Sequence, residues 1–304
     1  MRKFLRKLYY TLAGSFLSHV LAPIVQGVSF LHYHLLHISL KLSGAKMPSK
    51  EDILLMQKNV TFIYKSFERQ KMAVELYHNI QRFYPGVKVI IADDSKMPLD
   101  LQDDHVSVIQ LPFNSGLSRG LNCALAEVTT PFVIRMDDDE LLTLRTNFHR
   151  QLRFLLSHPE ADLAAVSCYS ALHLRSHQRC VNGFYKYSMA DAPKSLKIPH
   201  MTFLDDTHVV CGIVPQVFIA RTKSLQSIGY DDNIRMADHH EFFFRAAGNI
   251  VSTLANDSYV FHRHNQFDKK YAKYRSDISA DNQYIRQKIA LLKKSAHIQS
   301  TDMD

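Results

Sequence analysis

In Val133-Ile134-Arg135-Met136-Asp137-Asp138-Asp139-Glu140, an apolar segment runs directly into three consecutive carboxylates. The apolar residues 131–136 predict a buried strand, and the carboxyl ends of such strands are where α/β sheets bind ligands. Three like charges need a counter-ion, so one interpretation is a divalent cation site. In an extended segment Asp137 and Asp139 would point the same way and Asp138 the other. The alternative is a solvated acidic turn that caps the following helix.

Strands and helices alternate upstream of this segment. Strands are predicted at residues 59–65, 87–92 and 106–111, with amphipathic helices after the first and third. This pattern indicates an α/β fold with a mostly parallel central sheet covered by helices on both faces. One crevice should then collect the strand ends at residues 65–69, 93–95 and 137–139. No glycine follows the first strand, which argues against a dinucleotide-binding or P-loop protein.

The second half is more irregular. Residues 148–156 predict a helix, residues 163–170 a strand, and residues 172–207 an insertion that would determine substrate specificity. Strand character resumes at residues 209–220, and a helix with acidic and imidazole groups at its start follows at residues 237–245. Two short strands are expected next, the second leading into Phe261-His262-Arg263-His264.

Both ends of the chain are basic and lie outside the predicted α/β domain of residues 51–268. The net charge is +8, and residues 1–50 and 269–304 hold clusters of Lys and Arg. Such clusters suit anionic lipid headgroups or phosphate-bearing substrates. Nucleic acid is disfavoured, because no nucleic-acid-binding motif accompanies the charge. Four widely spaced cysteines argue against a zinc site or a dense disulfide framework.

Residues 8–40 contain no Asp, Glu, Lys or Arg. The segment is long enough to cross a bilayer, although Pro23 and several polar residues interrupt it. We expect a helical segment that inserts into a membrane or lies on it, and the alternative is a packed helical subdomain. The expected location is the cytoplasmic face of a bacterial inner membrane, with a type II protein of the Golgi lumen as the alternative.

Several motifs in a fixed order resemble a GT-A glycosyltransferase of the family 2 type, and in particular its β-1,4-N-acetylgalactosaminyltransferase (GM2 synthase-like) branch. The motifs that carry the resemblance are Val60-Thr61-Phe62-Ile63-Tyr64-Lys65-Ser66-Phe67-Glu68-Arg69, Phe83-Tyr84-Pro85, Val89-Ile90-Ile91-Ala92-Asp93-Asp94-Ser95, Leu111-Pro112-Phe113-Asn114-Ser115-Gly116-Leu117-Ser118-Arg119-Gly120-Leu121-Asn122, Val128-Thr129-Thr130-Pro131-Phe132-Val133, the acidic triplet, and Asp238-His239-His240-Glu241-Phe242-Phe243. They span roughly residues 59 to 265.

The resemblance implies an inverting, metal-dependent enzyme. It would move a sugar, GalNAc or GlcNAc, from a UDP-sugar to a hydroxyl of a cell-surface glycan or glycolipid. Asp139, alone or together with Asp137, would hold Mn²⁺ or Mg²⁺, with His262 or His264 as a further ligand. This leaves open which of the two histidines binds.

The resemblance also implies which residues bind the nucleotide and which residue accepts the proton. Asp93 and Asp94 would hold the base and ribose, while Arg119 would reach the diphosphate or brace the acidic cluster. Lys65, Arg69 and Asp138 would lie in the same nucleotide-binding crevice. Inversion requires a general base. Glu241 is the first candidate and Asp238, one helical turn earlier, the second, because His240 replaces the acidic residue usual before the base.

Three other functions fit parts of the sequence. A sugar-phosphate nucleotidyltransferase would need a glycine-rich loop after the first strand, and Ser66-Phe67-Glu68 does not provide one. A catalytically inactive binding protein of the same fold would have no need for the acidic triplet and Glu241. A metallohydrolase could use the triplet with His262 and His264.

Overall fold

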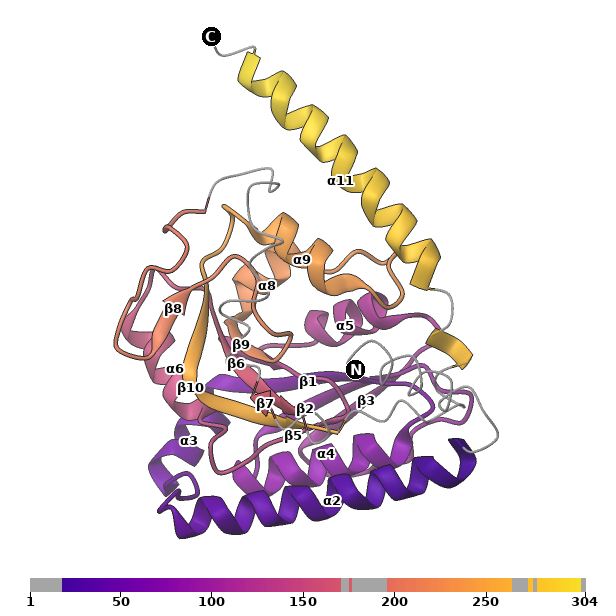
Figure 1. Cartoon of the computed structure of the whole chain (residues 1–304), viewed down its shortest axis with the longest axis vertical. Helices are drawn as coiled ribbons and strands as arrows, with labels where there is room; N and C mark the ends of the chain where they lie inside the picture. The colour runs from indigo at the N-terminus through magenta and orange to yellow at the C-terminus, as the bar shows by residue number, and fades with distance from the viewer. Residues whose placement is uncertain (1–17, 171–174, 177–195, 264–272, 276–277, 302–304) are drawn as a thin grey trace, which may run out of the picture.

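A computed structural model describes residues 18–170, 175–176, 196–263, 273–275 and 278–301. A mixed β-sheet forms its centre, with helices on both faces (Figure 1). The helices are α2 (Ser18–Leu42), α3 (Lys50–Asn59), α4 (Gln70–Phe83), α5 (Leu117–Ala126), α6 (Phe148–Ser157), α8 (Thr222–Ile228), α9 (Asp238–Ala246), the short 3₁₀ helix η4 (Lys273–Arg275) and α11 (Ile278–Thr301). The strands are β1 (Val60–Ser66), β2 (Lys88–Asp93), β3 (Val106–Gln110), β4 (Phe132–Arg135), β5 (Glu140–Leu141), β6 (Leu163–Ser170), β7 (Arg175–Ser176), β8 (His208–Val210), β9 (Phe218–Arg221) and β10 (Ser252–His262).

The sheet has the strand order β3-β2-β1-β4-β9-β6-β10-β5, with β7 paired to β6 and β8 to β10. Strands β3, β2, β1 and β4 are parallel, as the alternation of strands and helices predicts. The prediction of a mostly parallel sheet is wrong for the other half, because β9 is antiparallel to both β4 and β6. Phe218, the first residue of β9, pairs with Arg135, the last of β4. The described residues 196–217 form no helix, and β9 enters the sheet from the end where β4 finishes.

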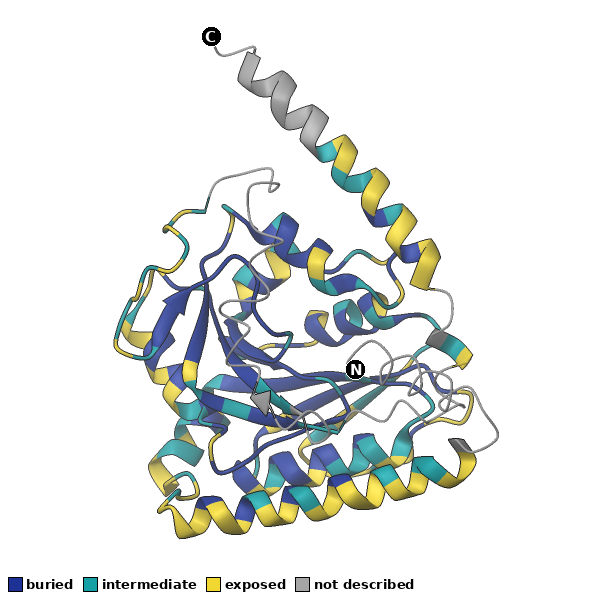
Figure 2. Cartoon of the chain, in the orientation of Figure 1, coloured by how far each residue is buried: buried dark blue, intermediate teal, exposed yellow. Residues whose placement is uncertain are grey.

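Two apolar layers sandwich the sheet, because alternate residues of a strand face opposite sides. In β1, Phe62 and Tyr64 belong to one core and Ile63 to the other. Residues of α3, α4 and α6 complete the first core, and residues of α5, α8 and α9 complete the second. The central strands β1, β4 and β9 are accordingly buried except at Lys65 and Arg221 (Figure 2). The predicted helical cover on both faces is confirmed.

Helix α2 lies along α4 on the outside of the first core (Figure 1). It is anchored by Tyr33, whose hydroxyl donates to the Leu142 carbonyl at 2.8 Å and accepts from Asn79 Nδ2 at 2.9 Å. None of the helices in the described part of the chain has the length and apolar character that crossing a bilayer requires. Of the predicted segment, residues 8–17 fall outside the described residues, and the remainder packs as a helix on the α/β domain.

Two strand predictions differ from the structure. The single strand expected at residues 209–220 is divided into β8 and β9, which flank a non-strand segment containing Pro215. The two short strands expected after Gly248 form one strand, β10, whose register shifts between Leu254 and Tyr259. This irregularity allows β10 to pair with β8 at one end and β5 at the other. Most of the predicted insertion lies outside the described residues.

Candidate active site

A cleft of about 400 Å³ lies at the carboxyl ends of β1 and β4, where the parallel half of the sheet predicts a ligand site. Lys65 and Arg69 reach it from the end of β1 and the start of α4. The acidic triplet enters from the end of β4, and His262 from the end of β10. The sequence therefore anticipates the main walls of this cleft.

The acidic triplet forms a turn. The Glu140 amide donates to the Asp137 carbonyl at 3.1 Å, so the alternation expected of an extended segment is absent. Asp138 and Asp139 share the Arg69 guanidinium, whose Nη1 donates to Asp139 Oδ2 at 3.0 Å and whose Nη2 donates to Asp138. Asp137 instead pairs with Arg135 at 2.9 Å. Arg69 thus holds Asp138 and Asp139 together, while Asp137 turns to Arg135, and all three carboxylates line the cleft.

The pKa values of the two paired carboxylates shift in opposite directions. Burial and the neighbouring Asp139 and Asp137 raise the pKa of Asp138 to about 7, although Arg69 opposes the shift. Burial alone would raise the pKa of Asp139 as well, but Arg69 and His262 hold it well below its usual range. Asp139 is therefore the carboxylate that stays ionised at neutral pH.

His262 faces Asp139, with 3.4 Å between Nε2 and Oδ1. Burial alone would lower the pKa of His262, but Asp139, Glu140 and Asp137 outweigh it and raise the pKa to about 9. A carboxylate and an imidazole at this separation are a suitable donor pair for a transition-metal ion. Within the described residues no group of three or more His, Cys, Asp or Glu side chains is arranged to hold one, and His264 lies outside them. A metal here would be held by Asp139 and His262, with further ligands from a substrate or from residues outside the described ranges.

Lys65 and Asp94 form a buried ion pair across the ends of β1 and β2. Asp94 Oδ2 also accepts from the Gly116 amide at 3.0 Å. Gly116 has φ of 101°, a conformation that favours glycine, and a Cβ there would lie 3.2 Å from the Arg235 backbone. A Cβ on Gly120 would lie 2.9 Å from the Lys65 side chain. The two glycines of the predicted helix start therefore make room for this pair.

Asp93 has a different environment from its neighbour. Its Oδ1 accepts from the Ser95 hydroxyl at 2.6 Å, and its Oδ2 from the Leu99 amide at 2.9 Å. Both oxygens thus shape the turn after β2, and Asp93 does not line the cleft. Arg119, also predicted to contact nucleotide, is exposed on α5 and is likewise absent from the cleft wall.

An aromatic cluster forms the outer wall of the cleft. Tyr274 lies edge-on to Phe67 at 5.0 Å and to Phe113 at 5.8 Å between ring centroids. Lys65 Nζ lies 4.7 Å from the centre of the Phe67 ring. Rings beside a buried Asp and a Lys are suited to stacking on a nucleobase.

Arg135 connects this cleft to helix α9. It is 1% exposed, its Nη2 pairs with Asp137, and the same nitrogen is 4.0 Å from Asp238 Oδ2. Asp238 begins α9, and no hydrogen bond to that oxygen is formed within the described residues. Burial raises the pKa of Asp238 to about 6, with Arg135 opposing the shift. Asp238 is thus a buried carboxyl that can exchange a proton near neutral pH.

Glu241 lies one turn further along α9 and is held by two cations. Arg245 Nε donates to Glu241 Oε1 at 2.5 Å and Nη2 donates to Oε2 at 3.0 Å. Lys288 of α11 also donates to Oε1, at 2.5 Å. The carboxylate is 1% exposed and does not line the cleft. Asp238 does not line the cleft either, but Arg135 connects it to Asp137 of the acidic triplet, whereas Glu241 pairs with Arg245 and Lys288.

The sequence assigned the tail only a basic surface for anionic lipids or phosphate-bearing substrates, and it assigned Arg135 no role. Asp281 of α11 lines the cleft and accepts from the backbone amides of Arg235, Met236 and Ala237. The i, i+3, i+7 spacing of Asp281, Tyr284 and Lys288 indicates one polar helix face and could have suggested this docking. A lone arginine within the apolar strand β4 was the corresponding signal for Arg135.

Comparisons with known proteins indicate the family of this chain. Residues 61–204 match glycosyl transferase family 2. The chain is 29% identical over 244 residues to beta-1,4 N-acetylgalactosaminyltransferase 2 of Mus musculus, covering 76% of this chain and 46% of the relative. It is 30% identical over 219 residues to beta-1,4 N-acetylgalactosaminyltransferase 1 of Rattus norvegicus, covering 67% and 38%. The chain thus spans less than half the length of these relatives.

A solved structure of S. aureus TarS 1-349 in complex with UDP is similar at 18% identity and a TM-score of 0.47, covering 67% of this chain and 60% of that one. The complex with UDP-GlcNAc has a TM-score of 0.48 at 17% identity, covering 69% and 61%. On this sequence match, residues 61–204 of the chain form a glycosyl transferase family 2 domain.

Proposed function

We propose that this chain transfers a sugar from a UDP-sugar to an acceptor hydroxyl, inverting the anomeric centre with a divalent metal ion. The observation that carries the proposal is the connection from the cleft carboxylates to Asp238 through Arg135. Through Arg135, a cleft that suits a nucleoside diphosphate is connected with a buried carboxyl that can take a proton. The names of the relatives make an N-acetylhexosamine the first donor to test.

The nucleotide would lie along the ends of β1 and β2. Asp94 would accept hydrogen bonds from the base or ribose, with Lys65 orienting the carboxylate and opposing the rise in its pKa that burial causes. Phe67 and Tyr274 would stack on the base. Arg69, at the mouth of the acidic turn, would approach the diphosphate.

Asp139 and His262 are the residues that would hold the metal, because they face each other and both line the cleft. A bound Mn²⁺ or Mg²⁺ supplies positive charge to the leaving diphosphate. Asp139 is ionised already, whereas His262 must lose its proton to bind. Asp137, the other predicted ligand, would position Arg135 instead.

Asp238 would act as the general base. Its raised pKa lets it accept the proton of the attacking hydroxyl as the bond to the sugar forms. Glu241 would hold α9 and α11 in place through its two cationic partners. The acceptor would be a hydroxyl of a glycan or glycolipid, and the outward apolar residues of α2 would rest on a membrane surface.

A donor screen tests this proposal. UDP-GalNAc, UDP-GlcNAc and UDP-glucose would be incubated with the chain and a panel of glycans, with Mn²⁺ or with EDTA, and UDP release and product would be measured. We expect transfer with one UDP-N-acetylhexosamine and none in EDTA. Asp139→Asn should weaken UDP binding in the presence of Mn²⁺ and abolish transfer.

Asp104→Asn is the matched control, since it makes the same change at an exposed residue outside the cleft. It should leave binding and transfer unchanged. Transfer that proceeds fully in EDTA would refute the metal, and the absence of binding to any UDP-sugar would refute the donor class.

A further inference from the structure

A second cavity lies between α2 and α4, on the far side of Arg69 from the cleft. Its volume is about 570 Å³, within the usual range for small-molecule sites. Pro23, Val25 and Phe30 of α2, Met72 of α4 and Leu141 of β5 give it apolar walls. Arg69 lines both this cavity and the cleft.

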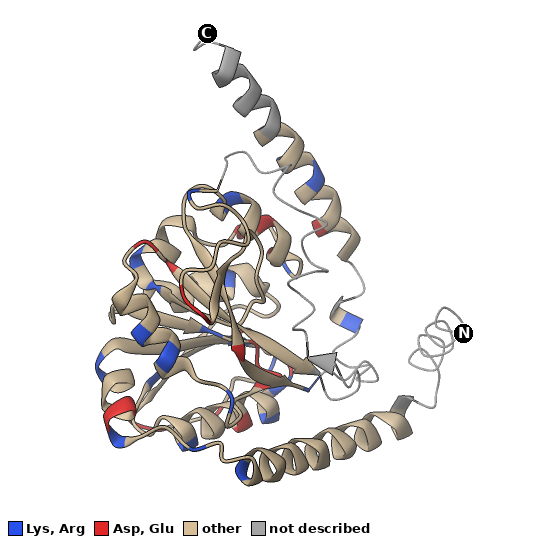
Figure 3. Ribbon diagram, turned by 60° about the vertical axis from the view of Figure 1, so that its left-hand side comes forward, with Lys and Arg blue, Asp and Glu red and all other residues tan. Residues whose placement is uncertain are grey.

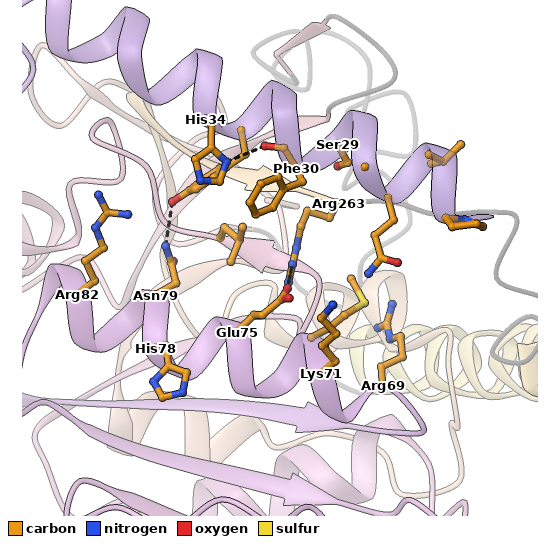
Figure 4. A pocket seen from close by; sticks show the side chains of 17 residues that line it. Ser29, Phe30, His34, Arg69, Lys71, Glu75, His78, Asn79, Arg82 and Arg263 are labelled. Atoms are coloured by element: carbon orange, nitrogen blue, oxygen red, sulfur yellow. Dashed lines mark hydrogen bonds and ion pairs between the residues drawn. The ribbon is translucent and has the colours of Figure 1, made fainter. Parts of the chain in front are cut away.

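Cations dominate the charged groups around this cavity. Its charged lining consists of four cations, Arg69, Lys71, Arg82 and Arg263, and one anion, Glu75. Since Arg69 is engaged by Asp138 and Asp139, three cations face one carboxylate. In Figure 4 Arg69 and Lys71 lie near one end of the cavity and Arg82 near the other, with Arg263 between α2 and α4.

Arg263 is the most deeply placed of these cations. It follows His262 at the end of β10, and the two side chains line different sites, His262 the cleft and Arg263 the cavity. The Arg263 side chain is 11% exposed and pairs with Glu75 through Nη1. Its Nε and Nη2 are buried and form no hydrogen bond to any described residue. Buried guanidinium donors of this kind are costly unless an acceptor reaches them.

The outer face of α2 adds a second observation. Leu31, Leu35 and Ile38 are more than half exposed, and Lys41 is the only charged residue of the helix (Figure 3). A hydrocarbon chain leaving the cavity would therefore meet an apolar surface without charged groups. The cationic interior and the apolar exterior suit the two ends of a single kind of molecule.

We propose that the cavity between α2 and α4 binds an anionic amphiphile, with its phosphate-like headgroup at Arg263 and Lys71 or Arg82 and its hydrocarbon chain against α2. Guanidinium groups pair with phosphate oxygens through two parallel hydrogen bonds, which would satisfy the buried donors of Arg263. The ligand requires neither nucleotide nor metal, so this proposal does not depend on sugar transfer.

Calorimetric titration of the full chain with three probes tests the proposal. Decyl phosphate carries both an anionic headgroup and a hydrocarbon chain. Inorganic phosphate carries only the anion, and decyl maltoside carries the hydrocarbon chain on an uncharged headgroup. We expect saturable binding of one decyl phosphate, and at least tenfold weaker binding of each of the others. If decyl maltoside bound as tightly as decyl phosphate, the cavity would not recognise an anionic headgroup. If inorganic phosphate bound as tightly, the cavity would not recognise a hydrocarbon chain.

Charge reversal supplies the matched variants. Lys71 and Arg82 are exposed at the rim, so Lys71→Glu with Arg82→Glu should preserve the fold and weaken decyl phosphate binding at least tenfold. Lys58→Glu with Lys88→Glu makes the same change in charge at exposed lysines away from the cavity and should alter binding less than twofold. Equal losses in the two pairs would indicate attraction to overall charge and refute the site.

A third variant tests the apolar wall. Phe30→Ser should weaken decyl phosphate binding severalfold and leave inorganic phosphate binding unchanged. An unchanged affinity for decyl phosphate would contradict the placement of the hydrocarbon chain against α2. Titration of the same samples with UDP reports on the cleft separately. Failure of the proposed transfer and failure of this inference can thus be told apart.

Discussion

Asp238 and Glu241 lie one turn apart on helix α9, and both are almost fully buried, yet their surroundings differ completely. Asp238 faces a single arginine at 4.0 Å, which it shares with Asp137. Glu241 is enclosed by Arg245 and Lys288, the latter from a distant helix. Burial makes both carboxylates sensitive to their partners, so the number and distance of the cations decide the role. A loosely paired carboxyl can exchange protons, whereas a tightly paired one holds elements together.

The largest expected effect is on Asp238. Asp238→Asn keeps the size of the side chain but cannot accept a proton, so the rate of transfer should fall by about 10²–10⁴-fold. UDP affinity should change less than twofold, because Asp238 does not line the nucleotide cleft. Turnover by the variant and UDP binding by calorimetry would be measured on the same preparation. Full activity in Asp238→Asn would exclude it as the base.

Glu241→Gln should act on stability instead. Removing the charge leaves Arg245 and Lys288 without their shared anion, and breaking such a buried pair costs about 3–5 kcal/mol. The melting temperature should drop, while turnover per folded molecule stays within a few-fold of the wild type. Glu127→Gln, at an exposed position, is the control and should alter neither quantity. A stable Glu241→Gln protein that has lost turnover would reverse the two assignments.

Much of the cleft could be predicted because its residues follow directly from strands. Lys65, Asp139 and His262 each lie at or close to a strand end, and parallel strands bring such ends to one edge of a sheet. The burial of β1 and β4 on both faces was readable from their continuous apolar runs. The local sequence pattern was therefore sufficient to predict a cleft residue wherever the strand that carries it determines its position.

The rest could not be predicted because it depends on long-range contacts. The direction of β9 depends on where residues 211–217 re-enter the sheet, which no local periodicity encodes. The choice between Asp238 and Glu241 depends on Lys288, 47 residues away in the sequence. The spacing on α9 shows only that the two carboxylates are neighbours. Which of them is neutralised is a property of the assembled fold.

The pH dependence of turnover sharpens the comparison further. Burial raises the pKa of Asp238 to about 6, and the base must be deprotonated to act. Turnover at saturating metal should therefore rise about tenfold per pH unit below pH 5 and level off above pH 7. Saturating metal is needed because His262, with a pKa raised to about 9, must also lose its proton to bind metal. A pH-independent rate between pH 5 and 7 would argue against Asp238.

The smallest expected effect is on Lys288. Its Nζ donates to Glu241 Oε1 and to Asp231 Oδ2, both at 2.5 Å, and the side chain is 23% exposed. Lys288→Met keeps the length of the side chain and leaves Arg245 paired with Glu241. The free energy of unfolding should therefore fall by about 1–3 kcal/mol, which is typical of hydrogen bonds to charged groups. Chemical denaturation would measure it, with Arg286→Met on the exposed side of α11 as control.

Because Asp281 lies on the same helix and caps the segment that enters α9, loosening α11 should also lower UDP affinity slightly. If Lys288→Met destabilised the protein as much as Glu241→Gln, α11 and not Arg245 would be the main support of α9, and the tail would count as part of the catalytic domain.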